Sequence, residues 1–186
     1  CAIGVATEDP SEGNSFDVKK IGVSLMESDI KFSVETYSSL DGVDVSGFFW
    51  LDTDQDSSTG VGEGWFPGYG LNDIGADYVL HFYFSDLWSQ AELYRMNDGV
   101  WQWVGHYPLE RQDSTLIISV PLSDLQDEGA LDLTFMGEVE YPYWGMDIVP
   151  DVGHVTTVVT GGIDWLLVSP EHGAVEPGKE VNVTIT

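Results

Sequence analysis

The sequence predicts an all-β protein, an antiparallel β-sandwich with little or no helix. Apolar residues alternate with small or polar residues through much of the 186-residue chain, which is the period-two pattern of half-buried strands. The 21 glycines and 8 prolines supply turns between these short runs. The longest segment that favours a helix is the short turn at residues 121–125. Many short strands at this spacing are typical of two packed antiparallel sheets.

The first two strands are predicted on either side of a tight turn at residues 27–29. Apolar side chains fall on every second position in residues 21–25 and again in residues 30–34. A second pair is predicted around Asn97-Asp98-Gly99, a strong hairpin signal between residues 91–96 and 100–104. Further strands with the same alternation are predicted at residues 78–84, 116–120 and 131–139.

The chain is strongly acidic, with 32 Asp and Glu residues against 6 Lys and Arg residues and a formal net charge of -26. Phosphates would be repelled, which argues against nucleic acid and against anionic membrane surfaces as partners. Such a charge also destabilises the compact state by self-repulsion, so we expect high salt, bound divalent ions or both. The hydrophobic content of 42% still predicts one folded domain, which we place at residues 15–160.

Aspartates stand at three alternating positions directly after the aromatic strand that ends at Leu51. A tight loop can turn carboxylates with this spacing inward as ligands for a hard cation. No basic residue lies between positions 48 and 78, so nothing in the stretch neutralises their repulsion. A solvated acidic turn is the alternative. The predicted calcium ligands are Asp52, Asp54 and Asp56, with help from Asp77 and from the Thr59 hydroxyl or loop carbonyls.

A second acidic turn is predicted at residues 147–153, near the end of the predicted strands. Pro150 would fix a turn that presents Asp147 and Asp151 together, and we expect a second calcium ion there.

The order of several motifs resembles a widespread secreted β-sandwich module, the DOMON and family 9 carbohydrate-binding group. The resemblance covers about residues 15–155. It implies a jelly-roll-like sandwich with structural calcium, appended to secreted enzymes or surface proteins and not itself catalytic. It does not identify a ligand. The matching motifs are residues 17–21, 30–34, 51–60, 74–78, 120–125 and the acidic Pro-Asp-x-Gly corner at 147–153.

Motifs for catalysis are missing from the sequence. The four histidines are scattered, and there is no HExxH, P-loop or GxSxG pattern. Adjacent carboxylates carry little information about glycosidase chemistry when 32 acidic residues are present. We therefore predict that the chain is not an enzyme.

Aromatic residues suggest a ligand site of another kind. Trp65 and Tyr69 lie in the glycine-rich loop 62–70, and Trp101 lies on a predicted strand. Exposed flat rings stack on sugar faces, so these three residues are candidates for a polysaccharide platform. The alternative is that the rings plug the ends of the sandwich.

The two ends of the chain carry separate expectations. A chain that begins at Cys1 resembles a mature lipoprotein, with residues 1–14 as a tether and the lipid as the only link to a membrane. An intermolecular disulfide of this single cysteine is an alternative. Residues 161–186 resemble the opening of a bacterial Ig-like domain, and Asn182 lies in a glycosylation sequon.

The last residues have the pattern of a strand. Val181, Val183 and Ile185 alternate with polar residues, so we expect this segment to pair with a sheet edge, either its own or a neighbour's. Pairing between copies would be self-association that does not close and would build a fibre. A truncated next domain is a further alternative.

These observations predict a non-catalytic, calcium-stabilised β-sandwich that works in the extracellular space or at the cell surface. Its predicted role is that of a structural or assembly module of a surface protein or filament. The alternative function is that of a carbohydrate-binding accessory module of a secreted enzyme.

Overall fold

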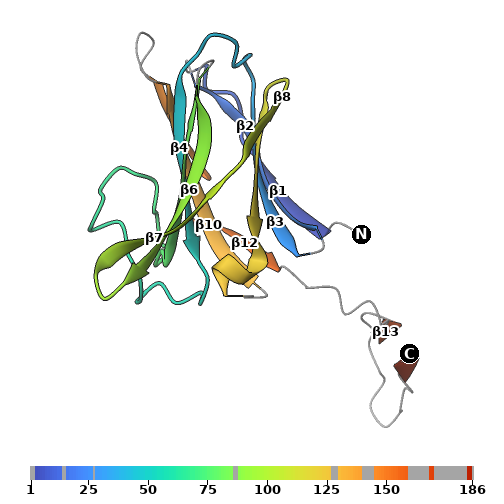
Figure 1. Ribbon diagram of the computed structural model, residues 1–186, viewed down its shortest axis with the longest axis vertical. Helices are drawn as coiled ribbons and strands as arrows, with labels where there is room; N and C mark the ends of the chain where they lie inside the picture. Colours follow the sequence, from blue (N-terminus) through green and yellow to red (C-terminus); the bar gives the residue numbers. More distant parts are fainter. Residues whose placement is uncertain are drawn as a thin grey trace.

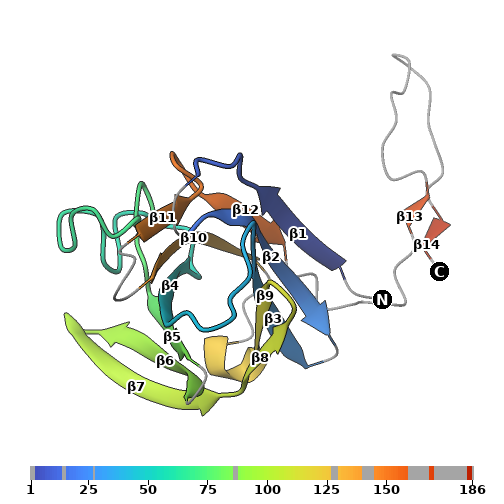
Figure 2. The same cartoon turned by 90° about the horizontal axis from the view of Figure 1, so that it is seen from above.

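The computed structural model describes residues 3–13, 16–26, 28–85, 88–126, 130–139, 145–158, 168–169 and 184–185. Two antiparallel sheets make up most of this part of the chain and face one another (Figures 1 and 2). The predicted all-β, sandwich-like fold is confirmed. The described residues contain a single short 3-10 helix, η1 (Leu122–Leu125), at the turn that the sequence marked at 121–125.

The first sheet has the strand order β1-β2-β3-β9-β8. The predicted first hairpin is present, since Met26 lies opposite Asp29 where its two strands meet. Residues 3–8, which the sequence analysis places in the N-terminal tether, form the edge strand β1 and pair with β2 from Ile3 opposite Leu25 to Glu8 opposite Lys20. This pairing satisfies backbone groups of β2 that would otherwise lie at the edge of the sheet. The strands are β1 (Ile3–Glu8), β2 (Val18–Met26), β3 (Asp29–Thr36), β8 (Leu109–Gln112) and β9 (Thr115–Pro121).

The second sheet has the strand order β11-β10-β4-β5-β6-β7, and β12 shares with β11 the outer edge of β10. The predicted hairpin at residues 97–99 is present, with Asp98 and Gly99 at φ 51° and 77°. Both residues are left-handed, as the tight turn between twisted strands requires. The strands are β4 (Val45–Asp52), β5 (Tyr78–Phe84), β6 (Ser89–Asn97), β7 (Val100–Tyr107), β10 (Ala130–Val139), β11 (Gly145–Val149) and β12 (Val155–Val158).

The main core lies between the two sheets. The ring of Phe32 on β3 lies 5.3 Å from that of Phe49 on β4, and Phe49 lies 4.8 Å from Phe135 on β10. Aromatic contacts at these separations stabilise the packing of one sheet on the other.

A second, smaller core lies on the outer face of the second sheet. Trp50 on β4 and Val79 on β5 pack there against Val61, Leu71 and Ile74 from the loop that joins these two strands. We call residues 53–77 the β4–β5 loop. Because this loop folds back over the sheet, β4 is buried on both faces, and its buried carboxyl end becomes the floor of a site.

The C-terminal region contributes β13 (Val168–Ser169) and β14 (Thr184–Ile185), which pair as a separate two-stranded sheet. Ile185, predicted to be part of an assembly strand, lies opposite Val168 of the same chain. Val181 and Val183 of that strand, Asn182 and Cys1 lie outside the described residues. In the part of the chain that the structure describes, no helix has the length and apolar character needed to cross a membrane.

Candidate cation site and aromatic groove

The ends of two neighbouring strands bring the predicted carboxylates together. Asp52 is the last residue of β4, and Asp77 directly precedes β5, its antiparallel neighbour. The backbone N–H of Asp77 donates to the Leu51 carbonyl over 2.8 Å and extends the ladder to this point. Strand pairing therefore places side chains from the two ends of the β4–β5 loop side by side.

Asp52, Asp54 and Asp77 form one compact group of carboxylates. One oxygen from each lies within 4.8 Å of the others. Calcium binds oxygen ligands at about 2.4 Å, so two ligands on opposite sides of one ion are about 5 Å apart. The spacing of these three oxygens therefore fits a single hard cation.

Donors from the surrounding loop fix all three side chains. Asp77 Oδ2 accepts hydrogen bonds from the backbone N–H and the hydroxyl of Thr53, both at 3.0 Å. The Thr59 hydroxyl donates to the Asp54 carboxylate at 3.0 and 3.1 Å. The Gly75 N–H donates to Asp52 Oδ2 at 3.1 Å. These bonds hold the carboxylates against their mutual repulsion.

The other oxygen of Asp52 has no such partner. Asp52 is only 1% exposed, and its Oδ1 is buried and makes no hydrogen bond. Burial raises the pKa of this carboxyl to about 6, and its contacts with Asp54 and Asp77 raise it further, while the Gly75 N–H opposes the shift. A buried oxygen without a hydrogen-bond partner destabilises the fold by about 1 to 3 kcal/mol. A bound cation would remove this cost.

The backbone of the β4–β5 loop is closely packed beneath the site. Val61 and Ala76 exchange two backbone hydrogen bonds of 2.9 and 2.8 Å across the loop. A Cβ atom on Gly75 would lie 2.3 Å from the Thr59 carbonyl oxygen, and one on Gly60, at φ 60°, would lie 2.5 Å from that of Ala76. Only glycine fits at these two positions, so the loop holds its carboxylates in a fixed arrangement.

Asp56 and Thr59 have other roles than the one predicted. Asp56 is not in the carboxylate group; its Oδ1 accepts from the Ser58 N–H at 3.0 Å and the Ser58 hydroxyl at 2.6 Å, which lowers the pKa of Asp56. Alternation aligns residues only while the chain is extended, and Gln55 has left the strand with φ at 55°. The hydroxyl of Thr59 donates to the Asp54 carboxylate, so Thr59 lies beside the group.

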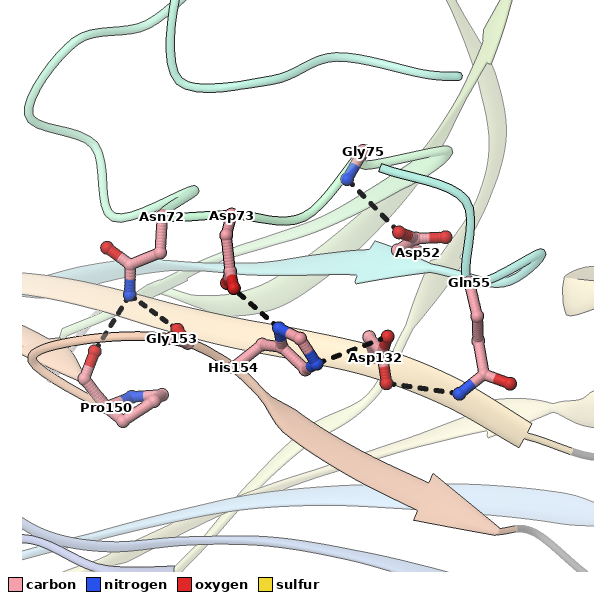
Figure 3. A network of polar contacts seen from close by, with 9 residues as sticks. All are labelled: Asp52, Gln55, Asn72, Asp73, Gly75, Asp132, Pro150, Gly153 and His154. Carbon is pink, nitrogen blue, oxygen red and sulfur yellow. Dashed lines mark hydrogen bonds and ion pairs between the residues drawn. The ribbon is translucent and has the colours of Figure 1, made fainter. Parts of the chain in front are cut away.

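A polar network beside the site ties the β4–β5 loop to the neighbouring strands (Figure 3). His154 lies between two carboxylates, with Nδ1 2.9 Å from Asp73 Oδ1 and Nε2 3.4 Å from Asp132 Oδ2. Gln55 donates to the other oxygen of Asp132 at 3.2 Å. The hydrogen bond with Asp73 raises the pKa of His154. Asp132 lies opposite Asp52 in the sheet register, so this network braces the strand next to the site.

The sequence gives no signal for this network. Asp132 and His154 are far from the loop along the chain, and only the pairing of β10 with β4 and β12 brings them near it. Asn72 adds a further link by donating to the carbonyls of Pro150 and Gly153 at 3.0 and 2.7 Å (Figure 3).

The other predicted calcium residues lie elsewhere in the fold. Asp147 on β11 is 3% exposed, and its Oδ2 accepts from the Val18 N–H at 2.7 Å. Asp151 is exposed in the turn after β11. Neither belongs to the group formed by Asp52, Asp54 and Asp77.

A groove of about 380 Å³ opens on the outer face of the second sheet. Tyr69 and Trp101, two of the three predicted platform residues, line it, while Trp65 is not in the lining and is 62% exposed. The Trp50 indole donates to the Tyr69 carbonyl at 2.8 Å and fixes the loop against the sheet. The lining residues are Phe48, Trp50, Phe66, Tyr69, Val79, His81, Tyr94 and Trp101.

The rings in this groove contact one another. Phe48 stacks on His81 at 4.5 Å and lies nearly parallel to Trp50 at 5.8 Å. Trp50 in turn lies 6.3 Å from Trp101. The predicted platform residues did not include Phe48, Trp50 or His81, although period two places positions 48 and 50 of β4 on the same face.

The chain was compared with known proteins in three ways. No family model, no curated protein and no solved structure matches the chain. The resemblance to DOMON and family 9 carbohydrate-binding modules therefore stays a prediction, and the function is argued from the two sites.

Proposed function

We propose that this protein is a calcium-stabilised, non-catalytic β-sandwich that serves as a structural module outside the cytoplasm. The observation that carries the proposal is the buried Oδ1 of Asp52, which has no hydrogen-bond partner, in a residue that forms one carboxylate group with Asp54 and Asp77. In a chain with a net charge of -26, a cation at this position offsets both the burial of one carboxylate and the repulsion among three.

The chemistry of the site favours calcium over magnesium. Calcium accepts six to eight oxygen ligands in flexible geometry, whereas magnesium demands a near-ideal octahedron and keeps several waters. Three carboxylates from the end of β4 and the β4–β5 loop, with loop carbonyls and water to complete the shell, match the calcium pattern. An ion held there would connect the end of β4 with the start of β5 and close the β4–β5 loop.

The assembly part of the predicted role rests on the sequence of the C-terminal strand alone. The extracellular location rests on the resemblance to secreted modules. Calcium is also more available outside cells, where weaker sites suffice.

The decisive experiment compares thermal unfolding in chelator and in millimolar calcium. At about a hundredfold excess over the dissociation constant, one site on the native state adds about 2.7 kcal/mol to the free energy of unfolding. We expect Asp52→Asn, which keeps the shape of the side chain and removes its charge, to lose most of this gain. Asp98→Asn, in an exposed hairpin turn, is the matched control and should keep it. Identical wild-type melting curves in chelator and in calcium would contradict the proposal.

A second candidate function is carbohydrate binding in the aromatic groove. The observation that favours it is that Tyr69 and Trp101 line a common hollow with four further aromatic side chains and His81. Flat rings at the surface stack on the apolar faces of sugars, and the imidazole and phenol groups can orient hydroxyls. In this role the protein would be an accessory module that retains a polysaccharide.

A further inference from the structure

We propose that the aromatic groove on the outer face of the second sheet binds a small organic cation of the trimethylammonium class, with choline as its simplest probe. The ligand carries one positive charge and is free in solution. This inference goes beyond the proposed function, because its ligand is not a polysaccharide and its binding does not depend on an ion at Asp52.

Aromatic side chains form most of the groove. Six of its eight lining residues are Phe, Tyr or Trp, and the other two are Val79 and His81. Its volume of about 380 Å³ lies at the lower end of the range for small-molecule sites, which is about 300 to 1,000 Å³. The groove therefore has the size and the lining of a site for a compact, weakly hydrated ligand.

The rings around the groove lie in different planes. The plane of Tyr69 makes an angle of 78° with that of Phe48 and of 65° with that of Phe66. Trp101 is tilted by 45° from Trp50. Sugars stack on a flat, open platform, whereas quaternary ammonium groups bind where several aromatic rings enclose them. Walls at steep angles therefore favour a compact cation over a sugar.

Two hydrogen bonds hold these walls in place. The Trp50 indole donates to the Tyr69 carbonyl at 2.8 Å, which fixes the loop wall of the groove to the sheet. The Tyr94 hydroxyl donates to Glu92 Oε2 at 2.6 Å on the opposite side, on β6. Because the rings are positioned before a ligand arrives, binding requires little ordering of side chains.

Glu92 places a negative charge beside the groove. Its carboxylate is held by Tyr94, a lining residue, and its Oε1 lies 3.3 Å from His106 Nδ1. Within the described ranges, no Lys or Arg forms an ion pair with Glu92. A cation in the groove would be attracted both by this charge and by the aromatic rings.

The groove supplies no cation of its own. Burial lowers the pKa of His81, although the negative charges of Glu92 and Glu138 oppose the shift, so the imidazole is neutral near pH 7. Arg95 follows Tyr94 on β6, but its guanidinium lies 5.8 Å from the ring of Tyr78, which belongs to the main core on the other side of the sheet. Among the described residues, no Lys or Arg lines the groove.

These features also select among cations. Metal ions require several oxygen ligands, which an aromatic lining does not offer. Zwitterions, including the head groups of phosphatidylcholine, carry a negative group that Glu92 and the net charge of -26 repel. The groove therefore favours a free compound with a single positive charge.

An NMR titration at constant ionic strength tests the proposal. It compares choline with its neutral carbon analogue, in which a tert-butyl group replaces the trimethylammonium group, and follows the indole N–H signals of Trp50 and Trp101. We expect choline to bind at least about tenfold more tightly, corresponding to about 1.4 kcal/mol, because the attraction to the rings requires the charge. Equal affinities for the two compounds would overturn the proposal.

Variants of one exposed wall residue locate the binding. Tyr69 is 46% exposed, so its substitution leaves the core intact. Tyr69→Leu should weaken choline by about tenfold, whereas Tyr69→Phe, which keeps the ring, should bind like the wild type. Trp65→Leu is the matched control, since Trp65 lies in the same loop but outside the lining. A Tyr69→Leu variant with wild-type affinity would contradict the assigned site.

The charge and the source of the ligand are tested separately. Glu92→Gln should weaken choline and leave the neutral analogue unchanged, and glycine betaine should bind more weakly than choline. Phosphatidylcholine vesicles should not sediment the protein; capture by these vesicles would overturn the assignment to a free compound. Retention on a neutral polysaccharide without any response to choline would overturn the proposal in favour of the carbohydrate function.

Discussion

At the residue scale, two aspartates of one loop respond to opposite surroundings. Asp52 is buried, and burial raises its pKa to about 6, whereas the Ser58 hydroxyl and N–H stabilise the charge of the exposed Asp56 and lower its pKa. Asp56 is satisfied within the loop, while Asp52 keeps one oxygen without a partner. The regular spacing of these residues in the sequence hides this difference.

The shifted pKa of Asp52 predicts how stability depends on pH when calcium is removed. The folded state holds the proton up to about pH 6, while the unfolded chain releases it near 3.8. The protonated Asp52 carboxyl therefore contributes to the free energy of unfolding below about pH 4. This contribution is lost as the pH rises through about 6. Denaturant unfolding in chelator at several pH values measures it.

The control is Asp52→Asn, which cannot titrate at this position and should lose that share of the pH dependence. In calcium the sign reverses, because the ion binds the ionised carboxylate and competes with the proton. The wild type should then gain stability as the pH rises toward 7. A wild type and a variant with the same pH dependence in chelator would contradict the assigned shift.

At the element scale, local pattern was sufficient for most strands. The alternation in β3 and β9 and the Asn97-Asp98-Gly99 turn are properties of neighbouring residues, and the structure confirms these elements. The double burial of β4 was not predicted, because it depends on the β4–β5 loop folding back over the outer face. The contact of His154 with Asp132 was not predicted, because it depends on the pairing of β10 with β12.

The candidate site was predicted in part. Asp52 and Asp54 follow a strand and Asp77 precedes the next one, so antiparallel pairing is enough to predict that they meet. Asp56 was predicted to turn inward with them in a tight loop, but its carboxylate accepts hydrogen bonds from Ser58 within the loop. Position along a strand is readable from sequence, but the direction of a side chain in a loop depends on each backbone angle.

The aromatic groove gives a prediction for β7. Trp101 lines the groove and is partly buried, whereas Trp103 on the same strand is 57% exposed and lies outside the lining. If the groove binds a polysaccharide, Trp101→Ala should reduce retention by about fivefold to tenfold, because one aromatic stacking contact contributes about 1 kcal/mol. Trp103→Ala should retain the polysaccharide normally. Affinity electrophoresis in soluble polysaccharides measures both variants.

The melting temperature separates binding from packing in this experiment. Trp101 lies 6.3 Å from Trp50, so a structural role would appear as a loss of stability in Trp101→Ala. Reduced retention at an unchanged melting temperature supports a ligand site. Failure of the wild type to be retarded by any polysaccharide would leave the groove as part of the outer core.

At the scale of the whole molecule, the main feature is a large negative charge that few basic side chains balance. The chain has 32 acidic and only 6 basic residues. Two of the basic residues form ion pairs at the surface, Lys19 with Glu35 and Arg111 with Asp41. Exposed pairs of this kind contribute little to stability, about 0 to 1 kcal/mol each. Cations from solution therefore have to supply most of the neutralisation.

This charge predicts two separable effects of salt on the melting temperature. Raising sodium chloride from about 0.01 M to about 1 M shortens the screening length from about 30 Å to about 3 Å, so general repulsion falls and the wild type should melt higher. Millimolar calcium should add a further increase that sodium chloride at equal ionic strength does not reproduce, because that increase requires ordered carboxylate ligands. The Asp52→Asn variant should keep the sodium chloride effect and lose most of the calcium effect. Calcium and sodium chloride that stabilise the wild type equally at matched ionic strength would show that screening alone acts and that no ion occupies the site at Asp52.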